Sequence, residues 1–136
     1  MTQPAVSDAG GRAPAIIRAA FLAGVLLFGG TTWFVHHYAP ASVADAPRAV
    51  AILRFAIVPV WMAALGATVV LRRIRRGTHD PARRAALLIV GWAIAEGVAL
   101  LGGVHWFLSG EPTFWVAGIL FYLASAWVLL PIAPPA

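Results

Sequence analysis

The sequence predicts an all-α, polytopic membrane protein, a bundle of four transmembrane helices, and three observations lead to that fold class. Of 136 residues, 61% are hydrophobic and only 11% are charged, whereas a soluble domain carries about 25% charged residues. Four nearly uncharged stretches are each long enough to cross about 30 Å of hydrocarbon. The ten basic residues are all arginine, and six of them occupy one short interval between two apolar stretches. A soluble globule and a disulfide scaffold are therefore excluded, and the lack of cysteine excludes thiol catalysis.

The four expected spans account for most of the chain. They lie at about 15–35, 49–71, 85–108 and 113–130. We therefore expect a transmembrane domain over residues 14–132, preceded by a mobile cytoplasmic tail at 1–13 and followed by a short tail at 133–136. The first span is long for the apolar core of a cleaved signal peptide, so we expect it to be retained.

Each span begins just after a proline, which suits the first helical turn because its missing N–H is not needed there. These prolines are Pro14, Pro47, Pro81 and Pro112. An acid stands just before three of the helix starts, where a carboxylate can cap free N–H groups and meet the positive end of the helix dipole. The three acids are Asp45, Asp80 and Glu111.

The arginines predict the orientation of the bundle. The loop between the second and third spans contains six, namely Arg72, Arg73, Arg75, Arg76, Arg83 and Arg84, and Arg12 and Arg18 flank the start of the first span. Since cytoplasmic loops carry the excess of basic residues, we expect this loop and both termini to be cytoplasmic, in a bacterial-type inner membrane. The same six arginines are candidates for contact with anionic lipid headgroups or with an acidic partner surface. We attribute the excess of positive charge to membrane topology rather than to nucleic-acid binding.

The third span is expected to be the most buried helix. It is rich in small residues, which let helices approach closely in lipid. The glycines of this span are Gly91, Gly97, Gly102 and Gly103, and Gly118 follows in the fourth span.

Glu96 is the acid for which helix capping offers no explanation. Asp8 lies in the tail, the three acids at helix starts have capping roles, and Glu96 lies near the middle of the third span. An ionised carboxylate near the bilayer midplane is costly, so Glu96 is expected to be protonated or paired. Two interpretations remain open: a proton-titrating functional group, and a neutral side chain that bridges to a neighbouring helix or protomer through a hydrogen bond.

Residues 86–102, ALLIVGWAIAEGVALLG, resemble the carboxylate-bearing helix of rotary ATPase c subunits, the proteolipids. The likeness rests on an Ala-Glu core followed by a short hydrophobic run and a glycine, after an arginine-containing loop. It implies reversible binding of a proton or Na⁺ at Glu96. The likeness covers one helix, the second span lacks the glycine stripe of the family's first helix, and two additional spans flank the hairpin.

Histidines near the expected outer face form a second candidate site. His36 ends the first span, His105 lies near the outer end of the third, and Arg54 is on the same side of the second. If they converge, they could hold a haem through two imidazoles or a quinone through hydrogen bonds. Interfacial histidines and an arginine that reaches towards the headgroups are the alternative. Glu96 and His105 are nine residues apart, on opposite faces of a helix, and cannot share one site.

The sequence therefore favours a small, non-enzymatic subunit that acts by helix packing in a homo-oligomer or a larger membrane complex, because no nucleophile constellation or metal cluster is evident. No cofactor and no metal are predicted. The alternatives are an ion-translocating protein that uses Glu96 and a small haem or quinone carrier that uses His36, His105 and Arg54.

Overall fold

A computed structural model describes residues 9–39 and 47–132, and the regular structure in these ranges is helical. There are four helices, the last of which continues into a π-helical segment. Their bounds are α1 (Ala9–Tyr38), α2 (Pro47–Gly77), α3 (Pro81–Ser109) and α4 (Thr113–Leu123), with the π-helical segment η3 at Ala124–Leu129. The predicted all-α fold class is confirmed.

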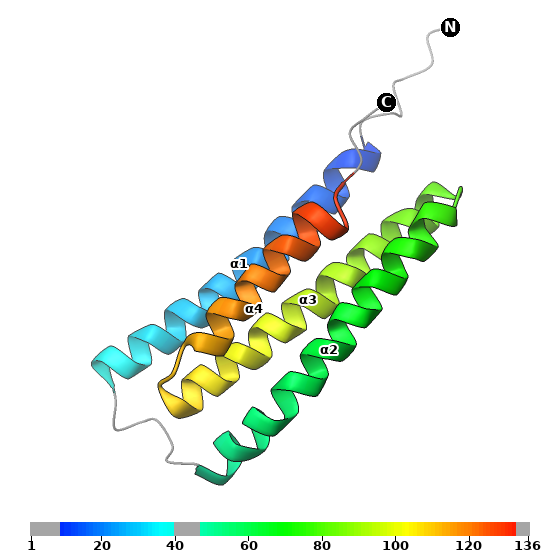
Figure 1. Ribbon diagram of the computed structural model, residues 1–136. Helices are drawn as coiled ribbons and strands as arrows, with labels where there is room; N and C mark the ends of the chain where they lie inside the picture. The colour runs from blue at the N-terminus through cyan, green and yellow to red at the C-terminus, as the bar shows by residue number, and fades with distance from the viewer. Residues whose placement is uncertain (1–8, 40–46, 133–136) are drawn as a thin grey trace, which may run out of the picture.

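Three of these helices, α1, α2 and α3, are long and apolar enough to cross a membrane, by length and composition. The helix formed by α4 and η3, Thr113–Leu129, is apolar but shorter. The helices run alternately up and down (Figure 1), so that the start of α1, the α2–α3 turn and the end of η3 lie at one end of the bundle. We call this the arginine end, since it contains residues 72–84, and the opposite end, which contains His36 and His105, the histidine end.

Helix α3 lies at the centre of the bundle and packs against α1, α2 and α4. It has the largest buried share of the three long helices, as its small residues predict. A β-carbon added at Gly118 of α4 would lie 2.6 Å from the Cα of Ala99 of α3, and one added at Gly102 would meet the backbone of Phe114. The glycines therefore set the close approach of α3 and α4. Gly97 differs, because a β-carbon there would have no neighbour within 4 Å.

The start and end of α3 have the local chemistry expected of helix termini. Asp80 caps the start, where its Oδ1 accepts a hydrogen bond of 3.0 Å from the Ala82 N–H, and Pro81 is in the first turn. Gly110 ends the helix with φ 76°, a left-handed conformation that glycine adopts without strain. The predicted capping role of Asp80 is thus confirmed.

The first helix begins earlier than the sequence predicts. Pro14 lies inside α1, which starts at Ala9, so the expectation that the first helix begins just after Pro14 is wrong. Residues 1–8 of the expected mobile tail, the expected tail at 133–136 and the expected cap by Asp45 lie outside the described residues. By contrast, α2 and α3 begin at Pro47 and Pro81, and Pro112 directly precedes α4.

A cluster of large side chains between α3 and the fourth helix forms the core. Trp92 of α3 and Tyr122 of α4 are fully buried among Leu88, Ala95, Ala126 and Leu130. The indole Nε1 of Trp92 donates a hydrogen bond of 3.2 Å to the Leu130 carbonyl. This bond attaches the end of η3 to α3.

Candidate functional site

Glu96 lies at the middle of α3, about three turns beyond Arg83 and Arg84 in the first turn of the same helix. Its carboxyl faces α1, where a β-carbon at Gly24 would lie 3.2 Å from its Oε1. Glu96 is half-buried and Gly24 is exposed, so the carboxyl lies beside a gap in the surface of α1. Within residues 9–39 and 47–132, no hydrogen bond or ion pair to this carboxyl is formed.

Two polar residues that the sequence reasoning did not connect to Glu96 lie near it. The Tyr122 hydroxyl donates a hydrogen bond of 2.7 Å to the backbone carbonyl of Arg18. Both Glu96 and Arg18 are close enough to act electrostatically on that hydroxyl. The Arg18 guanidinium lies 4.3 Å from the ring centre of Trp127 and 6.0 Å from that of Trp92, which is the geometry of a cation–π contact.

We call Arg18, Gly24, Glu96 and Tyr122 the Glu96 cluster. Helices α1, α3 and α4 each contribute to it, so no single stretch of sequence contains the arrangement. Two signals could have pointed to it: an arginine inside the first apolar stretch and a tyrosine in the middle of the fourth. Chemically, the cluster offers one carboxyl group that can gain or lose a proton, or donate a hydrogen bond, without first breaking a bond within the described chain.

At the histidine end, His36 binds the end of α3. Its Nε2 lies 3.2 Å from the Trp106 carbonyl oxygen and 3.1 Å from that of Phe107. The Trp106 carbonyl already accepts the Gly110 N–H at 2.8 Å. The Phe107 carbonyl is among the last of the helix, which have no intrahelical N–H partner, so a donating imidazole satisfies it. His36 Nε2 is therefore occupied, which leaves Nδ1 as the ring nitrogen with a lone pair for a metal.

His105 is fully buried and makes its contacts within α3 and the start of α4. Its Nδ1 lies 3.2 Å from Ser109 Oγ, whose hydroxyl donates to the His105 carbonyl at 2.7 Å. Its ring meets Phe114 edge-on, and its Nε2 has no hydrogen-bond partner. Since Ser109 Oγ has only one hydrogen, these contacts favour the tautomer with the proton on Nδ1.

Arg54 forms an ion pair with Glu111, with 2.7 Å between Nη2 and Oε2. The expectation that Glu111 caps the fourth helix is therefore wrong: α4 has no side-chain cap bond, and the carboxylate binds a guanidinium of α2 instead.

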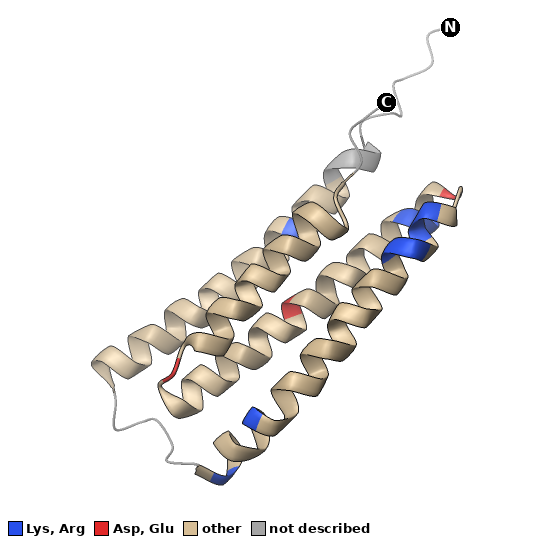
Figure 2. Cartoon of the chain, viewed as in Figure 1, with Lys and Arg blue, Asp and Glu red and all other residues tan. Residues whose placement is uncertain are grey.

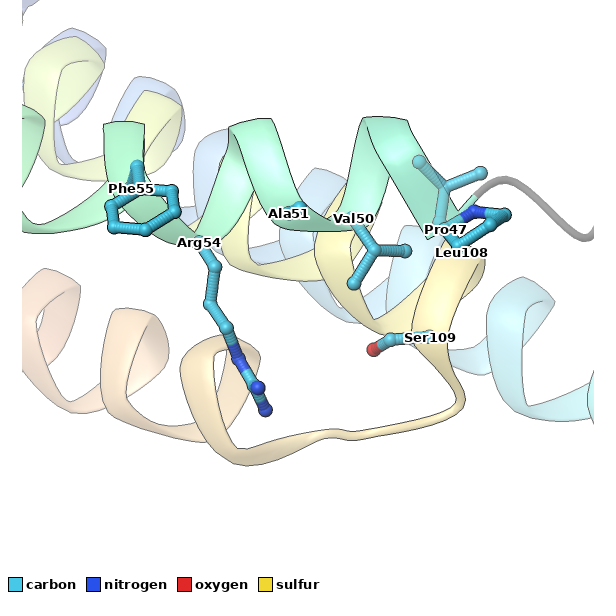
Figure 3. Close-up of a pocket in the computed structure, with 7 residues that line it drawn as sticks. All are labelled: Pro47, Val50, Ala51, Arg54, Phe55, Leu108 and Ser109. Atoms are coloured by element: carbon cyan, nitrogen blue, oxygen red, sulfur yellow. The ribbon is translucent and has the colours of Figure 1, made fainter.

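A cavity of about 660 Å³ opens between the start of α2 and the end of α3. Figure 3 shows its lining, in which Arg54 and Ser109 are the polar members; the lining residues are Pro47, Val50, Ala51, Arg54, Phe55, Leu108 and Ser109. Neither His36 nor His105 lines it. The structure thus places the three candidate cofactor residues on three different helices, with partners other than one another, and this leaves the haem arrangement without geometric support.

The six clustered arginines lie in the last two turns of α2 and the first turn of α3. Figure 2 shows them together at the arginine end.

In comparisons with known proteins, no family model, no curated protein and no solved structure matches this chain. The likeness of residues 86–102 to the proteolipid helix accordingly stays a prediction.

Proposed function

We propose that the protein is a small non-enzymatic subunit of a membrane assembly, either a homo-oligomer or a larger complex, in which Glu96 supplies a polar contact inside the bilayer. The observation that carries this proposal is the carboxyl group of Glu96 beside Gly24, at mid-helix and without a hydrogen-bond partner in the described chain. A polar group in hydrocarbon is costly unless it finds a partner. A helix of a second protomer, or of another subunit, would supply that partner at the gap that Gly24 leaves.

Apolar residues exposed on the outer surface of the bundle support the proposal that the protein lies in a membrane assembly. Helix α2 exposes Ile52, Phe55 and Met62, whose side chains are 65%, 85% and 65% accessible. Such a surface is unfavourable in water and suited to lipid or to a partner helix.

The proposed topology has four spans, with both ends and the arginine loop on the cytoplasmic side of a bacterial-type inner membrane. The basic residues concentrated at the arginine end support this orientation. The fourth helix, Thr113–Leu129, has the lower limit of about 17 residues that a span requires.

The assembly role can be tested by changing Glu96 in the full chain. We expect the wild-type protein, purified in a mild detergent, to have the native mass of an oligomer or complex, and the Glu96→Leu variant to dissociate. Glu96→Gln should remain associated, because an amide can donate the same hydrogen bond as a protonated carboxyl. Glu111→Leu is the control, since it makes the same replacement of a carboxyl group at the end of the bundle. A Glu96→Leu variant with the wild-type mass would refute the proposal.

A second candidate function, translocation of a proton or Na⁺, is favoured by the same unpartnered carboxyl and by the resemblance of residues 86–102 to the proteolipid helix. It differs in what it predicts for Glu96→Gln. An amide does not titrate, so flux of protons or Na⁺ into proteoliposomes should be lost in this variant even though assembly is retained. A hydrophobic carbodiimide should also label the wild-type protein and not Glu96→Gln. Flux that persists in Glu96→Gln would exclude this function.

A further inference from the structure

A second cavity, of about 340 Å³, lies at the arginine end of the bundle. Four of the six clustered arginines line it, together with apolar residues from the end of the fourth helix. The lining residues are Arg72, Arg75, Arg76, Arg84, Val128, Leu129 and Pro131. The cavity is therefore formed by three helices and combines a cationic wall with an apolar one.

The cationic wall lacks a counter-ion among the described acids. None of its four arginines forms an ion pair with an acid in the described ranges. Asp80, the nearest acid in sequence, has its carboxylate at the start of α3, where it caps the helix. Arg75 and Arg84 are close enough to repel one another. Like charges that the fold holds together in this way create a strong local field for an anion.

The arrangement of the guanidinium groups is partly fixed. Arg84 Nε donates a hydrogen bond to the Thr78 carbonyl, and the Thr78 hydroxyl donates to the Ile74 carbonyl at 2.9 Å. These bonds connect the start of α3 to the last turn of α2. The remaining N–H groups of the cluster have no hydrogen-bond partner within residues 9–39 and 47–132. They can bind phosphate oxygens, for which guanidinium geometry is well suited.

The apolar wall is held in place by the core. Leu130 is fully buried and its carbonyl accepts the Trp92 hydrogen bond, while the neighbouring Val128 is 67% exposed. A free inorganic anion would use the guanidinium groups alone. An amphiphile with an anionic head would use both walls, with its chains along the apolar surface of the bundle.

We propose that this cavity binds the phosphate of an anionic phospholipid, with Arg72, Arg75, Arg76 and Arg84 on the headgroup and Val128 against the glycerol and acyl region. The inference goes beyond the contact at Glu96 and does not depend on it. It also divides the six arginines, because Arg73 and Arg83 do not line the cavity, although they are exposed like Arg76 and Arg84. Those two provide a matched control of equal charge.

The experiment compares variants of the full chain in a neutral detergent, titrated with phosphatidylglycerol or phosphatidylcholine and observed by native mass spectrometry. For Arg75→Gln/Arg84→Gln we expect phosphatidylglycerol affinity to fall about 25-fold, since each basic residue near an anionic headgroup contributes about fivefold. Arg73→Gln/Arg83→Gln should stay within about threefold of the wild type because neither side chain lines the cavity and charges outside it are screened by solvent. Arg72→Gln/Arg76→Gln repeats the test without removing the Arg84–Thr78 contact.

Two further measurements distinguish binding of a lipid from binding of free phosphate. Val128→Asn keeps every arginine and should weaken phosphatidylglycerol binding, and inorganic phosphate at millimolar concentration should not compete with the lipid. Equal losses in the Arg73/Arg83 and Arg75/Arg84 pairs would overturn the proposal in favour of a general surface field. Competition by inorganic phosphate, with no effect of Val128→Asn, would overturn it in favour of a free-anion site.

Discussion

Gly24 of α1 and Glu96 of α3 face each other, so that a β-carbon at position 24 would lie 3.2 Å from the carboxyl Oε1. A side chain at position 24 would occupy the space beside the carboxyl group. The glycine therefore keeps Glu96 accessible from the side of α1.

Replacing Gly24 by valine should cover the carboxyl group. We expect labelling of Glu96 by a hydrophobic carbodiimide, measured as a mass shift of the intact protein, to fall several-fold because the added methyl groups crowd Oε1. Gly30→Val is the control, since a β-carbon there has no neighbour within 4 Å. Equal labelling of the two variants would contradict the proposed access route.

Gly118→Ala should destabilise the bundle. Its methyl group would lie 2.6 Å from the Cα of Ala99, so the α3–α4 contact would have to open. Overpacking of this kind costs about 1–3 kcal/mol, which would lower the Tm in detergent. Gly97→Ala meets no neighbouring atom, and alanine's better helix propensity should leave its Tm unchanged or higher. A Tm that falls equally in both variants would argue against close packing at Gly118.

The Arg54–Glu111 ion pair should contribute little to stability. Its side chains are 59% and 51% exposed, and exposed pairs typically contribute about 0.2–1 kcal/mol. A double-mutant cycle with Arg54→Gln and Glu111→Gln, measured by thermal unfolding, should give a coupling energy in this range that decreases as salt is added. A coupling well above that range, or one insensitive to salt, would indicate that the pair is buried in an assembly.

His36→Phe should destabilise the histidine end. The change removes the only side-chain donor that contacts the Trp106 and Phe107 carbonyls in the described structure, at a cost of about 0.5–1.5 kcal/mol. His37→Phe is the control, because the exposed His37 ring stacks on Trp33, with 5.2 Å between ring centres, and a phenyl ring can do the same. Amide hydrogen exchange at the end of α3 should quicken only for His36→Phe.

Much of the fold follows from local sequence signals. The length of the apolar stretches predicts the helices. Asp80 with Pro81 predicts the start of α3, because capping involves residues only a few positions apart. Pro14 misleads for the same reason: a proline that could begin a helix lies inside α1. Glu111 has the sequence position of a cap, yet it binds Arg54, a residue far away along the chain.

The sequence by itself determined the helical class, the presence of three long apolar helices, the small-residue character of α3 and the presence of one acid at mid-helix. These properties depend on composition and on short-range spacing. Only the tertiary structure decided that Glu96 faces Gly24 and lies near Tyr122, that His36 and His105 have separate partners, and that four of six arginines share a cavity with the end of η3. Such pairings depend on how each helix is rotated and shifted against α3, and the packing of side chains from distant segments determines that rotation.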